Sequence, residues 1–168
     1  EKDPYGFLKL EEEKILGESS NCLKLRIFAL TGKYIRDPNL FAFGNFILSA
    51  ISKKQIEIRS KQKVIRSYGH ASDITKFGIE WLLSDKSIKQ NLINAATHTV
   101  SLVELANMIS KKYQLGPIIS EIKDDYNVND YTCNVNSFID ILGYYKIKPT
   151  TLDKQVEETF NFLNSLEQ

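Results

Sequence analysis

The chain has 168 residues, of which 42% are hydrophobic and 26% are charged, and its net charge is +1 at pH 7. This composition is ordinary for a globular protein, and the length is enough for one domain with a sizeable core. The near-neutral charge gives no strong attraction to nucleic acid or to an anionic membrane, and no apolar run reaches membrane-spanning length. We therefore expect no nucleic-acid partner and no membrane partner.

Cysteine and histidine usage indicates a reducing compartment and argues against a metal centre. Cys22 and Cys133 are far apart in the sequence. We expect them to be reduced, buried thiols of a cytoplasmic protein rather than a disulfide. His70 and His98 are too few to form a separate metal cluster, so the prediction is no metal site.

The opening segment is predicted to be a helix over residues 3–18. Pro4 suits a first helical turn, because its missing N–H would have no partner there. Asp3 is a suitable N-cap, and Gly17 with the polar residues that follow ends the helix.

Tyr5 and Lys9 are four residues apart in this helix, so both side chains lie on one face. A neighbouring ammonium favours the phenolate and lowers the pKa of a tyrosine, which makes Tyr5 a candidate proton donor and acceptor with Lys9 as its activator. Two other interpretations remain. The helix is an ordinary amphipathic one with a snorkelling lysine, or the match is accidental, since the spacing recurs at Tyr144 and Lys148.

The next segments alternate between strands and helices. Residues 22–30 have strand composition, and their apolar end at 27–30 predicts burial on both faces, as in a parallel sheet. A polar loop follows at the carboxyl end of this strand, the edge where open α/β sheets bind ligands. The predicted elements up to residue 83 are this loop at 31–39, a helix at 41–52, a short strand at 55–59, a turn at 61–63, an extended piece at 64–68 and a helix at 70–83.

The second half continues the alternation. Ser101 followed by Glu104 predicts a capping box at a helix start. The predicted elements are a strand at 90–94, a loop at 95–99, a helix at 101–112, a strand at 118–122, an acidic, Asn-rich loop at 124–131, a helix at 135–142 that stops at Gly143, and a last helix from residue 150 or 151 to 166. The order of elements predicts an α/β fold.

Five landmarks follow one another in a recognisable order. They are Tyr5 with Lys9; residues 25–32 (LRIFALTG), similar to Arg-x-Phe-Asn-x-x-Gly; residues 64–73 (VIRSYGHASD), similar to Arg-Asp-Tyr/Phe-x-His-Val-x-Asp; residues 92–94 before Ser101; and Leu142 with Gly143 before the last helix. Together they resemble the C-terminal half of an extended short-chain dehydrogenase/reductase, the group of NAD-dependent nucleotide-sugar epimerases, dehydratases and reductases.

This resemblance implies the C-terminal part of a Rossmann-type parallel sheet plus a small α/β substrate-binding domain. Residues 1–38 and 64–98 would form the back half of the nucleotide-binding domain. Residues 39–63 and 99–168 would form the substrate-binding subdomain.

The resemblance also implies roles for particular residues. Tyr5 would shuttle a proton to or from a sugar hydroxyl, and Lys9 would activate it and hold the nicotinamide ribose of NAD or NADP. Leu30 and Thr31 would lie near the nicotinamide. The remaining implied contacts are with a nucleotide-diphosphate sugar, which Arg66 would grip by its diphosphate and Asn45 would also bind.

Alternatives remain for the central motif. Bidentate pairing of a guanidinium with phosphate oxygens supports the role of Arg66, whereas a salt bridge to Asp73 is the other interpretation. His70 and Asp73 are expected to cap and orient their helix rather than to do chemistry.

The sequence departs from the family at several points. Ala29, Ser67 and Ala96 replace the Asn, Asp and Gly of its motifs, and no Gly-x-x-Gly-x-x-Gly turn for the cofactor pyrophosphate occurs in the sequence. We expect a fragment that is inactive alone and that forms a homodimer or pairs with the missing N-terminal half. A non-catalytic binding module is the alternative. A helix-turn-helix at 100–112 is disfavoured, because a strand-like segment follows it.

Overall fold

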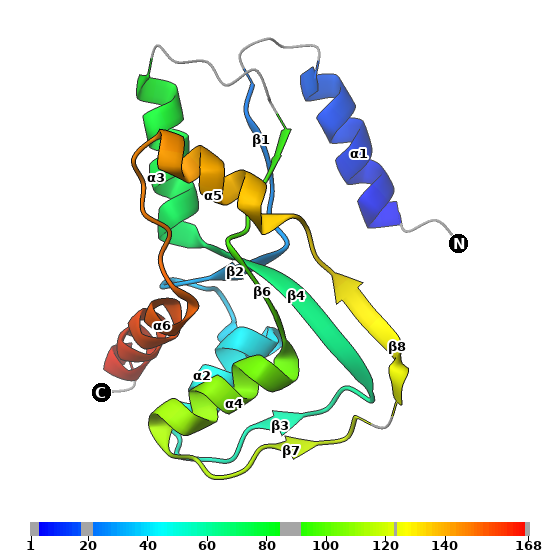
Figure 1. The fold of residues 1–168 in the computed structure, drawn as a ribbon, viewed down its shortest axis with the longest axis vertical. Coiled ribbons are helices and arrows are strands. Elements are labelled where there is room, and N and C mark those ends of the chain that lie inside the picture. The colour runs from blue at the N-terminus through cyan, green and yellow to red at the C-terminus, as the bar shows by residue number, and fades with distance from the viewer. Residues whose placement is uncertain (1–3, 18–21, 85–91, 123, 167–168) are drawn as a thin grey trace.

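The structure is a computed structural model that describes residues 4–17, 22–84, 92–122 and 124–166 (Figure 1). The helices are α1 (Pro4–Gly17), η1 (Pro38–Leu40, a 3-10 turn), α2 (Ala42–Ile51), α3 (Ala71–Leu83), α4 (Leu102–Tyr113), α5 (Val135–Tyr144) and α6 (Leu152–Leu166). The strands are β1 (Lys24–Arg26), β2 (Ala29–Thr31), β3 (Glu57–Ile58), β4 (Gln62–His70), β5 (Leu92–Asn94), β6 (His98–Ser101), β7 (Ile119–Ser120) and β8 (Asp124–Tyr131).

Strand β4 organises the main sheet. It pairs in parallel with β2 and with β8, and antiparallel with β6. Strand β6 pairs with residues 65–68 of β4, some of which also pair with β8 and one of which also pairs with β2. Strands β2 and β8 therefore lie end to end along the edge of β4 that faces away from β6. Two further parallel pairs, β1 with β5 and β3 with β7, complete a mixed α/β fold, as predicted.

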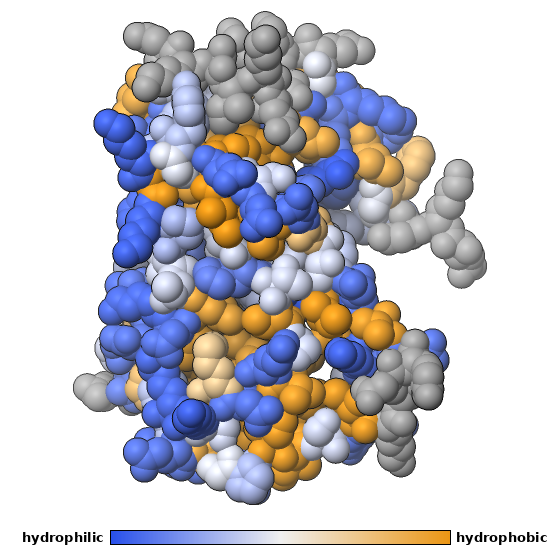
Figure 2. All heavy atoms as spheres, in the orientation of Figure 1, coloured by the Kyte–Doolittle hydropathy of each residue, from blue (hydrophilic) through white to orange (hydrophobic). Residues whose placement is uncertain are grey.

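Two hydrophobic cores hold the elements together. The first lies among α2, α4, α6 and the strands between them, around fully buried residues such as Ile47, Ile109 and Val156. The second joins α3, α5 and β5, where the Phe77 ring lies edge-on to Phe138 at 5.5 Å between centroids. On the face in Figure 2, apolar side chains are visible in both the upper and the lower half, among polar ones.

The helices follow the sequence prediction closely. All six lie at the predicted places, and the predicted cap Asp3 lies outside the described residues. The capping box is confirmed: the Ser101 hydroxyl accepts from the Glu104 N–H at 3.1 Å, and the Ser101 N–H donates to the Glu104 carboxylate at 2.7 Å. One correction is that Gly143 does not stop α5, because the helix continues to Tyr144.

The single strand predicted at 22–30 is wrong, since this segment forms two strands. β1 pairs with β5, the chain bends at Phe28, and β2 pairs with β4 instead. The predicted burial of the apolar end is also wrong, because Ile27 is 45% exposed and Leu30 is 42% exposed. The bend transfers the chain from one strand pair to another, and this leaves those side chains at a surface.

Two predicted loops are strands. Residues 98–101 form β6 and residues 124–131 form β8, although the latter segment is rich in Asp and Asn. Pairing with the long strand β4 overrides the low strand propensity of those residue types. The cysteines are free, as expected, but half-buried rather than buried.

Candidate functional site

A cavity of about 610 Å³ lies beside β2 and β4. Its walls come from the bend between β1 and β2, from β2, from the loop that leads to η1 and the end of η1, from the start of α2, from β4 and from the start of α4 (Figure 1 shows these elements). Most of the lining is apolar or aromatic, and Arg36 and Arg66 are its charged residues. A largely apolar cleft with a few charged groups is the usual form of a small-molecule site.

Arg66 is held in a fixed orientation at this cavity. Its Nη1 donates to the backbone oxygen of Asn129 at 2.7 Å, and its Nη2 donates to Asn129 Oδ1 at 2.9 Å. The predicted alternative, a salt bridge to Asp73, is not among the contacts of this carboxylate, which binds Thr150 instead. A guanidinium whose plane is fixed in advance loses little entropy when it pairs with an anion.

Leu30 and Thr31 lie on opposite faces of β2, as alternate strand residues must. Leu30 lines the cavity, whereas Thr31 is fully buried on the other side and its hydroxyl donates to Gln155 Oε1 at 2.6 Å. Asn45 is half-buried on α2 and is not among the lining residues. Four residues besides Tyr5 and Lys9 were predicted to contact the cofactor or the substrate, and the structure places the side chains of two of them, Leu30 and Arg66, at the cavity.

Tyr5 and Lys9 lie together on one face of α1. The Lys9 Nζ is 5.7 Å from the centroid of the Tyr5 ring, which is 69% exposed. The same ammonium pairs with Glu12 at 2.8 Å, and the hydrogen bond to this carboxylate raises the pKa of Lys9. Neither Tyr5 nor Lys9 lines the cavity. Sequence reasoning missed Glu12, although its spacing of three residues from Lys9 is the signal for such a pair.

An ion pair between Glu13 and Arg26 connects helix α1 to strand β1. The Glu13 carboxylate accepts from Arg26 Nε at 2.6 Å and from Nη2 at 2.5 Å. Tyr131, at the end of β8, lies 4.8 Å from Phe28 between ring centroids, and Phe28 lines the cavity. Sequence reasoning missed Tyr131 and Asn129 because it assigned β8 to a loop.

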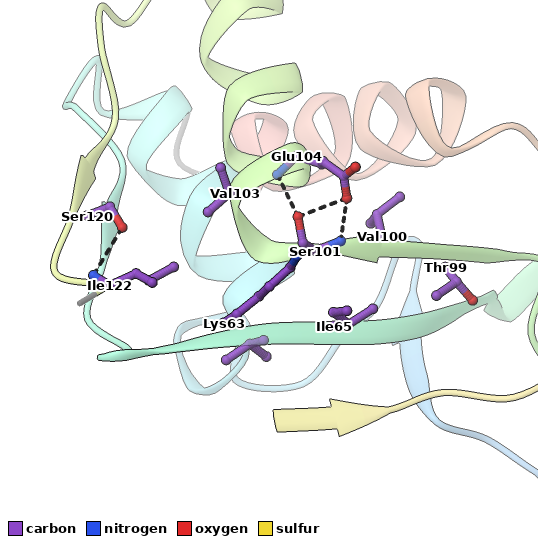
Figure 3. A pocket seen from close by; sticks show the side chains of 10 residues that line it. Lys63, Ile65, Thr99, Val100, Ser101, Val103, Glu104, Ser120 and Ile122 are labelled. Atoms are coloured by element: carbon purple, nitrogen blue, oxygen red, sulfur yellow. Dashed lines mark hydrogen bonds between the residues drawn. The ribbon is translucent and has the colours of Figure 1, made fainter. Parts of the chain in front are cut away.

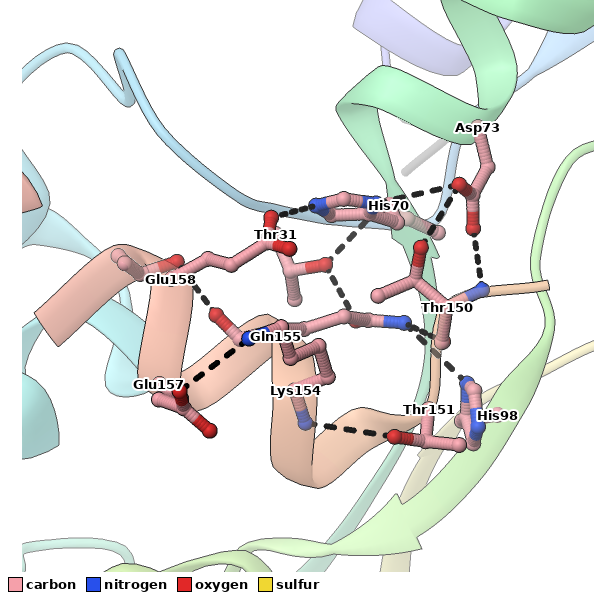
Figure 4. Close-up of polar contacts among 12 residues, drawn as sticks. Thr31, His70, Asp73, His98, Thr150, Thr151, Lys154, Gln155, Glu157 and Glu158 are labelled. Atoms are coloured by element: carbon pink, nitrogen blue, oxygen red, sulfur yellow. Dashed lines mark hydrogen bonds and ion pairs between the residues drawn. The ribbon is translucent and has the colours of Figure 1, made fainter. Parts of the chain in front are cut away.

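His70 and Asp73 do not cap α3 through their side chains, which corrects the sequence expectation. The N-cap residue His70 makes no side-chain cap bond. Asp73 instead accepts from the N–H of Thr150 at 2.7 Å and from its hydroxyl at 2.8 Å (Figure 4). Burial raises the pKa of Asp73, but the nearby His70 imidazole and the two hydrogen bonds from Thr150 outweigh burial and hold the pKa below its usual value.

A second cavity, of about 480 Å³, lies between β4, β6, α4 and the end of β7 (Figure 3). Two of its polar members, Ser101 and Glu104, are engaged with each other in the capping box. The Ser101 N–H and hydroxyl lower the pKa of Glu104. These groups stabilise α4 and leave the larger cavity as the candidate site.

Comparison with protein families and with curated proteins gives no match. Solved structures do match. UDP-glucuronic acid 4-epimerase from Bacillus cereus, in complex with UDP-glucuronic acid and NAD, aligns with a TM-score of 0.72 and 18% identity over 98% of this chain and 53% of that chain. UDP-glucose 4-epimerase from Thermotoga maritima aligns with a TM-score of 0.67 and 13% identity over 95% of this chain and 52% of that chain.

An NAD-dependent NDP-hexosamine 5,6-dehydratase of tunicamycin biosynthesis aligns with a TM-score of 0.71 and 11% identity, over 98% of this chain and 54% of that chain. The chain has the fold of the C-terminal half of these enzymes. It spans about half the length of the solved proteins that it matches.

No group of three or more His, Cys, Asp or Glu residues within the described part of the chain is arranged to hold a metal ion. None of the helices in the described ranges is long and apolar enough to cross a membrane.

Proposed function

We propose that the chain is the substrate-side half of an NAD-dependent nucleotide-sugar epimerase, dehydratase or reductase. The observation that carries the proposal is the fold match over nearly the whole chain to enzymes solved with NAD and UDP-sugars, joined to a Tyr–Lys pair on one face of α1. In this proposal residues 1–38 and 64–98 belong to the nucleotide-binding domain, and residues 39–63 and 99–168 form the substrate-binding subdomain.

Tyr5 and Lys9 would carry the acid–base chemistry. The Tyr5 phenol would give a proton to, or take one from, the sugar hydroxyl that changes oxidation state. The Lys9 ammonium, kept charged by Glu12, would favour the phenolate during that transfer and would hold the ribose hydroxyls of the cofactor. NAD or NADP, when bound, would supply the hydride exchange.

The larger cavity would hold the substrate and the nicotinamide end of the cofactor. Arg66, already oriented by Asn129, would pair with the diphosphate of the nucleotide sugar. Leu30 would pack beside the nicotinamide, and Thr31 would contact the cofactor through its backbone. Asn45 would contact the substrate. Of these residues, Arg66 and Leu30 line the cavity, whereas a glycine-rich cradle for the cofactor pyrophosphate is not in the sequence.

A partner would therefore supply that cradle. The part of the matched enzymes that this chain does not span is the expected partner, and a homodimer is the other arrangement we propose. The two free cysteines fit the reducing cytoplasm that we assign to the protein.

Ligand binding to the 168-residue chain tests the proposal. Titration calorimetry with UDP-glucose should show binding that Arg66→Ala weakens by about ten- to a hundredfold, the worth of hydrogen bonds to a charged group. Arg59→Ala is the matched control, because this side chain is 86% exposed and is not among the residues that line the cavity. Equal binding by wild type and both variants, or no binding at all, would refute the substrate site.

The isolated chain is also expected to show no turnover of nucleotide sugars with NAD. A non-catalytic binding module is the second candidate, favoured because α1 buries none of its residues and exposes Tyr5. In the enzyme assembled with its partner, Tyr5→Phe should lower kcat by about a hundredfold or more, the usual contribution of a proton donor. Unchanged turnover in that variant would favour a role in binding alone.

A further inference from the structure

His70 is a buried histidine whose two ring nitrogens both face carboxylates. Its side chain is 2% exposed; Nδ1 lies 3.4 Å from Asp73 Oδ1, and Nε2 lies 3.6 Å from Glu158 Oε2 (Figure 4). Neither nitrogen has a hydrogen-bond partner among the described residues. Asp73 belongs to α3 and Glu158 to α6, so the imidazole lies between two helices.

A neutral His70 has one N–H, although two carboxylates face its ring. A neutral imidazole offers one donor and one acceptor, whereas an ionised carboxylate only accepts. Asp73 is held in its ionised form by the two hydrogen bonds from Thr150. A neutral His70 can therefore satisfy one of the two carboxylates, and its other nitrogen then directs a lone pair at the second. One added proton gives an N–H toward each carboxylate.

The same imidazole supports the loop that forms one wall of the larger cavity. A Cβ placed on Gly32 would lie 3.1 Å from Cδ2 and 3.2 Å from Nε2 of His70, so this turn packs directly on the ring. The loop continues to Tyr34, which lines the cavity and contacts Phe162 of α6 at 4.5 Å between ring centroids. Helix α6 thus contacts the loop through Phe162 and faces His70 through Glu158, one helical turn away on the same face.

We propose that His70 is a positioning residue: uptake of one proton joins Asp73 and Glu158 through its imidazole, which fixes α6 against the cavity loop and tightens the binding of a nucleotide sugar. The effect on the ligand rests on the function proposed above. The joining of α3 to α6 does not.

Other titratable groups near this cluster act differently. His98, from β6, approaches Gln155 of α6 at 3.4 Å, and burial lowers its pKa against the opposing charge of Asp73. Because the pKa of His98 is lowered on folding, the folded protein loses stability through His98 as the pH falls below the ordinary histidine pKa. The proton uptake proposed at His70 would instead stabilise the fold on acidification. Farther along α6, Lys154 and Glu157 pair with each other at 3.2 Å. All proteins compared below keep His98, so its effect on stability is common to them and a difference in pH dependence reports on His70.

The first experiment measures urea midpoints of the 168-residue chain between about pH 8 and about pH 6, where imidazole titrates. The midpoint of wild type should rise on acidification relative to that of His70→Gln. Glu158→Gln should lose this rise and should gain stability at the higher pH, because its amide can donate to Nε2 of a neutral imidazole. Glu157→Gln, the same change one residue away, should follow wild type. Equal pH dependence in all four proteins would overturn the proposal.

The second experiment measures the Kd of UDP-glucose over the same pH range. Binding to wild type should tighten on acidification by up to about tenfold, the worth of one pKa unit, and binding to His70→Gln should not. If no protein binds UDP-glucose but the urea midpoints behave as expected, the proposed function fails and the joining of the helices stands. If both proteins bind with the same pH dependence, the effect of His70 on the ligand is refuted.

Discussion

Replacing Gly44 with alanine tests how closely α2 approaches the turn before it. A Cβ on Gly44 would lie 2.4 Å from the Pro38 carbonyl oxygen and 2.8 Å from Pro38 Cα, about 1 Å closer than ordinary contact. These are backbone atoms, so η1 must move away from α2. Such overpacking costs about 1–3 kcal/mol, and the better helix propensity of alanine returns up to about 1 kcal/mol. With the full return, the expected result is a net loss of up to about 2 kcal/mol, against the gain expected at an open helical position.

Gly78→Ala is the matched control for this measurement. Gly78 is also inside a helix, α3, but a Cβ there meets nothing within 4 Å. This variant should gain about 0.4–1 kcal/mol, because alanine reduces the freedom of the unfolded chain. Urea unfolding of the 168-residue chain, followed by circular dichroism, gives both free energies. If Gly44→Ala proves as stable as Gly78→Ala, the result would contradict the close contact between α2 and Pro38. It would also contradict the position of η1 in the cavity wall.

Two further predictions concern charged groups. Asp73→Asn should cost about 1–3 kcal/mol at neutral pH, since it weakens a buried, charge-assisted contact with Thr150. Because the pKa of Asp73 is lowered on folding, this stability should be present above the ordinary aspartate pKa of about 4 and should be lost below it, as the pH falls through the lower pKa of the folded state. A constant difference from wild type down to acid pH would contradict the assignment. Glu13→Gln should change global stability by less than about 1 kcal/mol, as exposed pairs do, yet speed amide exchange throughout α1 by loosening its tie to Arg26. Glu11→Gln, whose partner Lys14 lies within α1, should leave that exchange unchanged.

The helices could be predicted from the sequence because their signals are local. The capping box at Ser101 and Glu104 and the apolar spacing of 70–83 lie within a few residues of the elements that they specify. The same holds for the Tyr5–Lys9 pair, since four residues on a helix fix their common face.

The strands that the sequence analysis missed depend on distant partners. β8 is a strand because β4 offers an open edge, and neither its Asp and Asn residues nor its neighbours in sequence indicate this. For the same reason the orientation of Arg66 by Asn129 was not predictable, because the partner comes from that missed strand. The bend at Phe28 likewise follows from a change of strand partner, which no local pattern records.

The pairing of β4 with β8 also bears on how the protein is made. The chain completes β4 first, and α3, β6, α4 and β7 follow before β8 can close its remaining edge (Figure 1). A nascent chain therefore carries an open strand edge from the completion of β4 until β8 has been synthesised, and other unfinished chains can pair with that edge. The closing strand is rich in Asp and Asn, residue types with low strand propensity, and its pairing with β4 covers this edge.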